Sequence, residues 1–211
     1  MANKRAVKER APLGRALITS TAAEMIAEVG VDKLTMRAVA ARLGVSAMAL
    51  YHHVEDKDEL VRMVGDDLLG RIKLPDPDSG DCRERLMSIV TKTNESLLSV
   101  PGLSSVLLTS KLLPNARRLL LFCLYQFERG GLDRQAAQEA YAAVQQLGLG
   151  RLLVADSPNF RLSATPQPDN DIRDYMLKLQ SPATFEAALS ALLDHYLPSS
   201  RRPRAHRRTG R

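Results

Sequence analysis

The sequence predicts an all-helical protein with a small N-terminal unit and a larger C-terminal unit. The 211-residue chain has only 4% aromatic residues and no Trp, while Ala and Leu abound, a composition that favours helices over strands. Apolar residues recur with helical spacing along most of the chain, and we find no alternation of the kind that marks a half-buried strand. Hydrophobic residues make up 45% of the chain, which is enough to build a core.

The first expected helix covers residues 13–29 and supports the elements that follow it. Its apolar residues keep a helical period and stop before Gly30, a residue suited to ending a helix. These residues are Leu17, Ile18, Ala22, Met25, Ile26 and Val29.

Two short helices are expected next, joined by a three-residue turn. Thr35 can cap the first helix, and Gly44 supplies the left-handed residue that ends it. Ser46 is again a preferred N-cap, so a second short helix follows, with Leu50 facing inward. Two helices joined in this way form a helix-turn-helix, whose second helix enters the DNA major groove. The first helix has an apolar stripe of Met36, Val39, Ala40 and Leu43, and the small core is expected to hold Val31, Leu34, Val45 and Val54.

The next helix links this unit to the rest of the chain. Asp56 and Glu59 form a capping-box pattern at its start, and its apolar residues run to Ile72. The following segment is rich in Pro, Asp, Ser and Gly, which cannot continue a helix. We therefore expect a DNA-binding domain over residues 13–73, a linker over 74–82 and a second helical domain over 83–198.

Further helices are expected in the second domain, separated by Pro and Gly residues. Their expected ranges are 83–98, 103–113, 115–129, 133–155, 172–179 and 183–197. Residues 157–170 contain three prolines and are expected to form a flexible flap over a pocket.

Charge is unevenly distributed along the chain. The formal net charge of the chain is +6. Residues 1–15 carry +4 and residues 199–211 carry +6, so the residues between them have a net charge of −4. Such basic ends either bind phosphate or simply remain solvated. We expect a disordered basic arm over residues 1–12, with DNA contact as one alternative, and a disordered basic tail over 199–211.

Composition also bears on compartment and cofactors. No apolar run reaches the roughly 18 residues that a membrane span needs, and the basic N-terminus is not followed by an apolar stretch, so a soluble cytoplasmic protein without a membrane partner is expected. Cys82 and Cys123 are far apart and fit neither a metal knuckle nor a disulfide scaffold. We expect no metal and no cofactor.

The turn and second short helix carry a recognisable motif, G-V-S-x-x-A-L-Y-x-H-V-x-x-K. Its residues are Gly44, Val45, Ser46, Ala49, Leu50, Tyr51, His53, Val54 and Lys57. The motif resembles the DNA-binding domain of the tetracycline-repressor (TetR) family of bacterial regulators, and the resemblance covers about residues 15–70. It implies an all-α fold, an N-terminal three-helix helix-turn-helix domain followed by a larger helical domain for ligand binding and dimerisation.

The candidate DNA-binding residues lie on the two short helices and at the start of the next. Arg37 can make a bidentate contact to guanine, and the resemblance implies that this position reaches the groove; a solvated surface Arg is the alternative. Ala47 and Met48 are apolar and can pack on a thymine methyl group. The full set is Thr35, Arg37, Ser46, Ala47, Met48, Tyr51, His52, His53 and Lys57.

Four of these residues offer donors to phosphate oxygens: Tyr51, His52, His53 and Lys57. The alternative for Tyr51 is a buried aromatic position in the small domain, although the resemblance implies contact with DNA. The adjacent histidines could hold a metal only with further ligands, and no Cys or acidic cluster at ligand spacing supplies them. Thr35 and Ser46 are expected to act first as helix caps and second as phosphate donors.

The second domain is expected to join two subunits and to bind a small molecule. Small residues in the helices 133–155 and 183–197 allow close approach in an intersubunit four-helix bundle, or pack within their own chain: Ala136, Ala137, Ala140, Ala143, Gly148, Ala187, Ala188 and Ala191. Candidate ligand-binding residues on otherwise apolar helices are Asn94, Phe122, Gln126, Tyr141 and Gln145, with Gln146 beside them. The polar ones among them could equally lie on solvent faces.

These features predict a ligand-responsive transcriptional regulator. A single short helix reads only a few base pairs, so we expect a homodimer that binds a palindromic operator in double-stranded DNA, represses transcription and is released by a small-molecule effector. An activator uses the same geometry. The alternatives are a non-specific architectural DNA-binding protein and a helical enzyme; against an enzyme stands the lack of a nucleophile, base and orienting group at a recognisable spacing.

Overall fold

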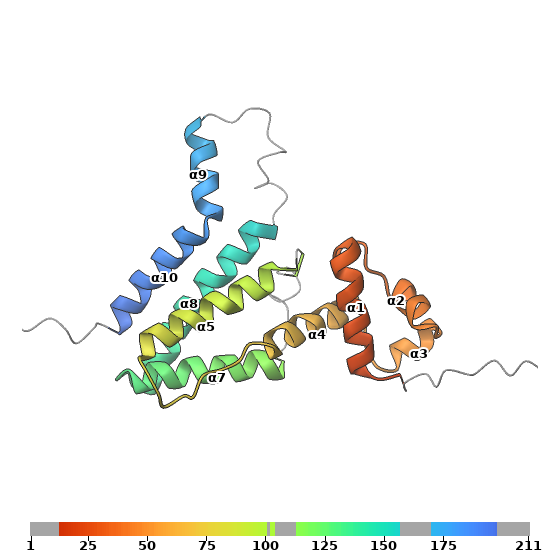
Figure 1. Ribbon diagram of the computed structural model, residues 1–211, viewed down its shortest axis with the longest axis horizontal. Helices are drawn as coiled ribbons and strands as arrows, with labels where there is room; N and C mark the ends of the chain where they lie inside the picture. The colour runs from red at the N-terminus through yellow and green to blue at the C-terminus, as the bar shows by residue number, and fades with distance from the viewer. Residues whose placement is uncertain (1–12, 101, 104–112, 157–169, 198–211) are drawn as a thin grey trace, which may run out of the picture. The chain divides into compact units, whose positions relative to one another are not determined.

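The computed structural model describes residues 13–100, 102–103, 113–156 and 170–197. In these residues the chain forms nine α-helices and no strand, which confirms the all-α prediction (Figure 1). The helices are α1 (Arg15–Val29), α2 (Met36–Leu43), α3 (Ala47–Tyr51), α4 (Lys57–Gly70), α5 (Cys82–Leu98), α7 (Pro114–Arg129), α8 (Arg134–Asp156), α9 (Asn170–Gln180) and α10 (Pro182–Tyr196). The predicted arm over 1–12, residues 104–112 of the predicted helix 103–113, the predicted flap up to residue 169 and the tail over 199–211 lie outside the described residues.

The chain divides into two compact units, Met1–Val64 and Gly65–Arg211. This division falls inside α4, and the predicted linker over residues 74–82 lies within the second unit. The reason is that the last turns of α4 bond to α7: the Asp66 carboxylate accepts the N–H of Asn115, and Arg118 donates to the carbonyl oxygen of Leu69. Helix α4 is therefore shared by both units.

The predicted caps of the helix-turn-helix are confirmed. The Thr35 hydroxyl accepts the N–H of Ala38 at 3.2 Å, and the Ser46 hydroxyl accepts the N–H of Ala49 at 3.1 Å. Gly44 ends α2 with φ 68°, a left-handed conformation that favours glycine. The start and end of both short helices therefore follow from residues within three positions of each end.

Helix α3 packs against the other helices of the N-terminal unit through one apolar side chain. Leu50 is its buried residue, and Val54 just beyond α3 is buried as well. The predicted core residues Val31 and Leu34 are also buried, while Val45 in the turn is only half-buried. Because α3 has five residues and one buried anchor, its orientation depends on what holds its two ends.

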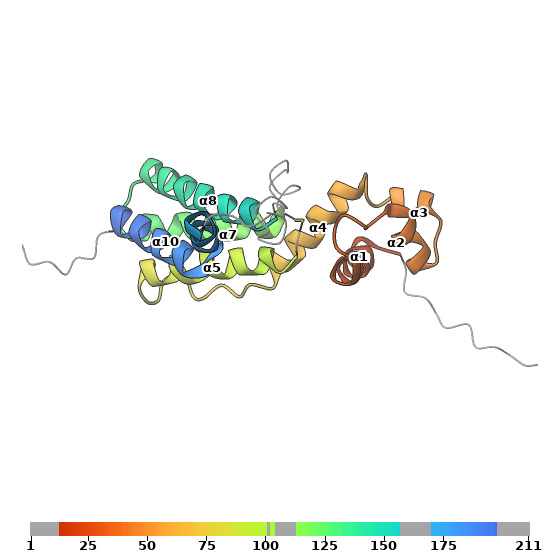
Figure 2. The ribbon, with the colours of Figure 1, turned by 90° about the horizontal axis from the view of Figure 1, so that it is seen from above.

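In the C-terminal unit, α7 packs against both α5 and α8, and α10 packs against α5 and α8. Figure 2 shows α7 between α5 and α8. Phe127 of α7 and Leu189 of α10 are fully buried between these helices. None of the described helices is long and apolar enough to span a bilayer.

The small residues of α8 and α10 differ in burial. Ala137, Ala140 and Gly148 are buried within their own chain, which is the second of the two arrangements considered for them. A Cβ atom at Gly148 would stand 2.7 Å from Nδ2 of Asn94 on α5, so a larger residue there would have to displace the buried side chain of Asn94. Ala187 and Ala191 on α10, by contrast, are exposed.

Candidate nucleic-acid interface

Helix α3 presents its outer face to solvent. Met48 is 68% exposed and Tyr51 is 48% exposed, and His52 is exposed as well. Leu50, on the opposite face, has no exposed surface. Met48 and Tyr51 therefore lie on the face of α3 that points away from the core, and an exposed helix face of this kind can enter a DNA groove.

Thr35 and Ser46 are exposed, and each uses its hydroxyl oxygen to cap a helix. In each cap the hydroxyl oxygen accepts the hydrogen bond, so the hydroxyl hydrogen is free to donate to a phosphate oxygen. The same side chain can therefore start the helix and bind the DNA backbone.

The remaining candidates on α2 and α3 differ in exposure. Arg37, in the first turn of α2, is exposed, and Ala47, the first residue of α3, is half-buried. Arg37 can therefore extend fully toward a base edge, whereas Ala47 offers only part of its methyl group.

His53 and Lys57 contribute to the fold of the N-terminal unit. Both are half-buried. The Lys57 ammonium donates to the carbonyl oxygen of Asp32 at 3.2 Å, and the carbonyl oxygen of His53 accepts from Arg15 at 2.6 Å. In the described part of the chain no group of three His, Cys, Asp or Glu side chains is arranged to hold a metal ion.

Two arginines of this unit have roles that the sequence pattern did not indicate. Arg42 of α2 makes two hydrogen bonds, of 2.7 and 2.6 Å, to the carboxylate of Glu28 on α1. The hydrogen bond from Arg42 holds the pKa of Glu28 below its ordinary value. Arg15 of α1 bonds to His53 and Glu59, 38 and 44 residues away. A helical pattern reports on neighbours three or four positions away, so no local signal identifies such contacts.

The candidate ligand-binding residues of the second unit fall into two groups. Asn94, Phe122 and Gln126 are buried, Tyr141 is half-buried, and burial raises the pKa of its phenol. Gln145 is exposed, as is Gln146, so these two take the solvent-face position that the sequence left open.

Gln126 and Asn94 carry the buried polar atoms of this group. The side-chain amide of Gln126 is fully buried and donates to the carbonyl oxygen of Pro77 at 3.0 Å. Within the described residues, Oε1 of Gln126 and Oδ1 of Asn94 are buried acceptors with no hydrogen-bond partner. Buried polar atoms are normally paired, so these two oxygens need an explanation.

A cleft of about 370 Å³ lies in the C-terminal unit between residues 73–81 and α5. Lys73, Pro75, Arg85, Ile89 and Lys92 are among the residues that line it. None of the five candidate ligand-binding residues does, so this cleft is separate from the predicted site.

The N-terminal unit matches a known family. Residues 18–64 match the model of the bacterial regulatory proteins of the tetR family. An HTH-type transcriptional regulator of Saccharopolyspora erythraea is 30% identical over 134 residues, which are 63% of this chain and 57% of that protein. An HTH-type transcriptional repressor of Mycobacterium tuberculosis is 24% identical over 199 residues, covering 91% of this chain and 73% of that protein.

Solved structures of similar fold extend over both units. The Streptomyces coelicolor TetR family protein ActR, in complex with actinorhodin, has a TM-score of 0.70 at 22% identity, covering 89% of this chain and 96% of ActR. A TetR variant from Acinetobacter baumannii, in complex with minocycline, has a TM-score of 0.69 at 23% identity, covering 88% of this chain and 97% of that chain. The chain thus carries a tetR-type domain at residues 18–64 and shares the all-helical fold of these TetR proteins.

Proposed function

We propose that the chain is a transcriptional repressor that binds a palindromic operator as a homodimer and releases it when a small molecule binds the C-terminal unit. The observation that carries this proposal is the position of α3. Its buried Leu50 anchors the helix, while Met48, Tyr51 and His52 face outward. This is the arrangement that a recognition helix needs to reach base edges in the major groove.

We expect a dimer because the exposed face of a single recognition helix is small. One recognition helix contacts only a few base pairs, and two half-sites one helical turn apart supply the missing discrimination. The exposed faces of α8 and α10 are the candidate interface. Ala187 and Ala191 lie one turn apart and are exposed on α10, and Leu153 of α8 is 44% exposed. Small exposed side chains on α10 and an exposed leucine on α8 favour close packing of helices from a second copy.

The buried acceptors of the C-terminal unit support a ligand-binding role. A molecule with hydroxyl or amino groups would satisfy Oε1 of Gln126 and Oδ1 of Asn94 by donating hydrogen bonds to them. The complexes of ActR with actinorhodin and of TetR with minocycline are precedents for ligand binding in this fold. The name of the Mycobacterium tuberculosis relative favours repression over activation.

Helix α4 is the element through which the ligand would act. It belongs to the DNA-binding unit as far as Val64 and to the C-terminal unit from Gly65 onward. A ligand that binds more tightly to one orientation of α4 shifts the population toward that orientation. The recognition helices of a dimer then no longer match successive major grooves, and DNA is released.

The test is selection of a binding site from a library of random 30-base-pair duplexes with the full-length chain. A specific dimer should enrich one palindrome and prefer it to a shuffled duplex by at least about a thousandfold at fixed salt. Light scattering should give twice the chain mass, free and on DNA. An architectural protein should enrich no sequence and should bind both duplexes with the same steep salt dependence, which would overturn the proposal.

A further inference from the structure

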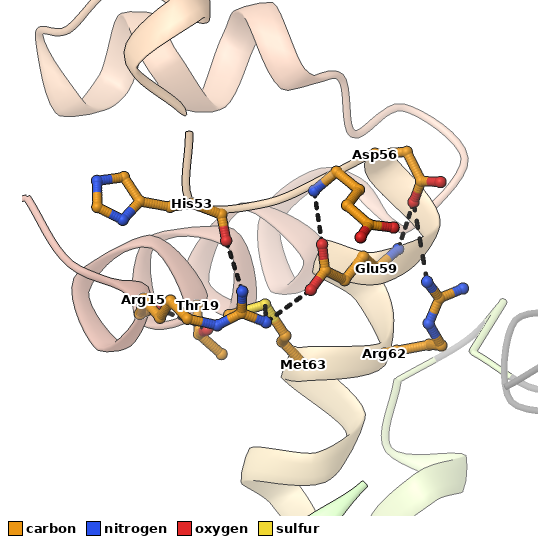
Figure 3. A network of polar contacts seen from close by, with 8 residues as sticks. Arg15, Thr19, His53, Asp56, Glu59, Arg62 and Met63 are labelled. Atoms are coloured by element: carbon orange, nitrogen blue, oxygen red, sulfur yellow. Dashed lines mark hydrogen bonds and ion pairs between the residues drawn. The ribbon is translucent and has the colours of Figure 1, made fainter. Parts of the chain in front are cut away.

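Arg15, the first residue of α1, holds together two segments that follow it by about forty residues. Its Nη1 donates to the carbonyl oxygen of His53 at 2.6 Å, and its Nη2 donates to Oε1 of Glu59 at 2.7 Å. The same Nη2 lies 3.1 Å from the sulfur of Met63 on α4. Figure 3 shows the guanidinium between the end of the recognition helix and the first turn of α4.

Glu59 extends this network to the segment between α3 and α4. Its second oxygen, Oε2, accepts the backbone N–H of Glu55 at 2.5 Å, and its own N–H donates to Oδ1 of Asp56 at 2.6 Å (Figure 3). Burial alone would raise the pKa of Glu59, but the hydrogen bonds from the Glu55 N–H and from Arg15, together with the charges of Arg15 and Arg62, lower it below its ordinary value. Glu59 therefore carries a negative charge at neutral pH and retains Arg15.

The contact with His53 falls where α3 needs support. The helix ends with His52 as its C-cap, and the carbonyl oxygen of Leu50 in its last turn accepts the backbone N–H groups of His53 and Val54. Arg15 bonds to the carbonyl oxygen of His53, the first residue beyond this cap, and a cation near the C-terminal end of a helix interacts favourably with the helix dipole. A five-residue helix is not stable on its own. Ser46 holds its start, Leu50 anchors its middle, and Arg15 is the side chain that holds its end.

We propose that Arg15 is a positioning residue for DNA recognition, which sets the orientation of α3 through His53 and Glu59 and does not itself bind phosphate. The proposal rests on the DNA-binding function proposed above. A basic residue near the N-terminus suggests a phosphate contact, but the charge of this one is already paired with Glu59. The side chain is 53% exposed, so the ion pair adds little to global stability, and its effect is on the geometry of α3.

The test compares full-length variants on the duplex that the wild-type chain selects from a random library, with a shuffled duplex as reference. Arg15→Ala should lower the preference for the selected duplex about tenfold, because a misplaced α3 loses the alignment of at least one base contact. The slope of log affinity against log salt should stay unchanged, since no phosphate contact is lost.

Two further variants separate positioning from phosphate binding. Arg15→Lys keeps the charge, but an ammonium cannot reproduce the fork that reaches His53 and Glu59, so it should not restore the preference. Glu59→Gln should weaken the preference as Arg15→Ala does. If Arg15 binds phosphate, Arg15→Lys should rescue binding and Glu59→Gln should tighten it, because a negative charge near DNA is removed. Either result would overturn the inference.

The matched control is Arg42→Ala, which removes an exposed Arg–Glu pair between α1 and α2 of the same unit. It changes the net charge by the same amount and should change the preference less than about twofold. An equal loss for Arg42→Ala and Arg15→Ala would indicate a general loss of stability or charge and would contradict a specific role for Arg15.

A measurement without DNA separates this inference from the proposed function. Hydrogen exchange of the amides of Val54 and Glu55 should accelerate at least about tenfold in Arg15→Ala and remain unchanged in Arg42→Ala, because the first bonds to Leu50 and the second to Glu59. Unchanged exchange would refute the support of α3 even if DNA binding is specific. If the wild-type chain selects no duplex, the DNA-binding function fails, and the role of Arg15 in recognition fails with it.

Discussion

Asp66 of α4 caps the start of α7, because its Oδ1 accepts the backbone N–H of Asn115 at 3.0 Å and that of Ala116 at 3.0 Å. Arg118 of α7 makes the converse contact, and its Nη2 donates to the carbonyl oxygen of Ile72, just beyond α4, at 2.9 Å. A carboxylate at a helix N-terminus and a guanidinium at a helix C-terminus are both favourable placements. The end of α4 is thus bonded to the start of α7.

The first prediction concerns this cap. Asp66→Ala should lower the free energy of unfolding by about 1–2 kcal/mol, because two half-buried backbone N–H groups lose their acceptor. Chemical denaturation monitored by circular dichroism measures the change. Asp67→Ala is the control: Asp67 makes an exposed pair with Arg71 and should cost no more than about 0.5 kcal/mol. Equal effects of the two variants would contradict the capping role.

The second prediction distinguishes base readout from backbone contact. Arg37→Ala should weaken binding to the selected operator and relax its sequence preference, since a bidentate contact to guanine discriminates by about 1–3 kcal/mol. Lys57→Ala should weaken operator and shuffled duplex nearly equally and reduce the salt slope by about one. Fluorescence anisotropy at several salt concentrations measures both. Equal losses on both duplexes for both variants would refute the assignment of Arg37 to a base.

The third prediction concerns the contact between α5 and α8. Gly148→Ala should lower the free energy of unfolding by about 1–3 kcal/mol, because the new methyl carbon would stand 2.7 Å from Nδ2 of Asn94. Gly150→Ala in the same helix is the control, since its methyl group would meet no atom of its own chain within 4 Å, and replacing a helical glycine there should leave stability unchanged or raise it. Thermal unfolding of both variants measures their stability relative to the wild-type chain. A destabilised Gly150→Ala with a tolerated Gly148→Ala would contradict the packing described here.

The fourth prediction concerns acid stability. The pKa of Glu59 is lowered in the folded chain, so its charge stabilises the folded state above its unfolded pKa of about 4.3, and this contribution is lost as the pH falls through the folded value. Wild type should therefore exceed Glu59→Gln in the free energy of unfolding at pH 7, and the difference should shrink below about pH 4. Denaturation curves between pH 7 and pH 3 measure this. A difference that stays constant across the range would show that the charge of Glu59 is not responsible.

The fifth prediction concerns the two thiols. The Cys123 side chain is only 2% exposed, and this burial raises the pKa of its thiol to about 12. Cys123 should therefore resist a thiol reagent in the folded protein. Cys82 is half-buried at the start of α5 and should react. Mass spectrometry after labelling at pH 8 identifies the modified residue, and both thiols should react in guanidinium chloride. Equally fast labelling of both in the folded chain would contradict the buried position of Cys123.

The sequence by itself determined the limits of the two helices of the helix-turn-helix. Thr35, Gly44 and Ser46 act on backbone groups within a few positions, so the limits of α2 and α3 could be derived from neighbouring residues alone. The exposure of Met48 and the burial of Leu50 also follow from helical spacing on a short helix with one inner face. The motif that resembles the TetR family lies in this locally determined stretch.

Only the tertiary structure decided which distant residues meet. Arg15 belongs to a basic N-terminal stretch in the sequence, yet the packing of α1 directs it to His53 and Glu59. The 74–82 segment has the composition of a linker, but only the structure shows that the Asp66 carboxylate before it bonds to the N-terminus of α7 after it. Gln126 and Gln145 have the same side chain on apolar helices, and one is fully buried while the other is exposed. The physical reason is that a side chain's partner across helices depends on the rotation and approach of both helices, which no spacing along one helix contains.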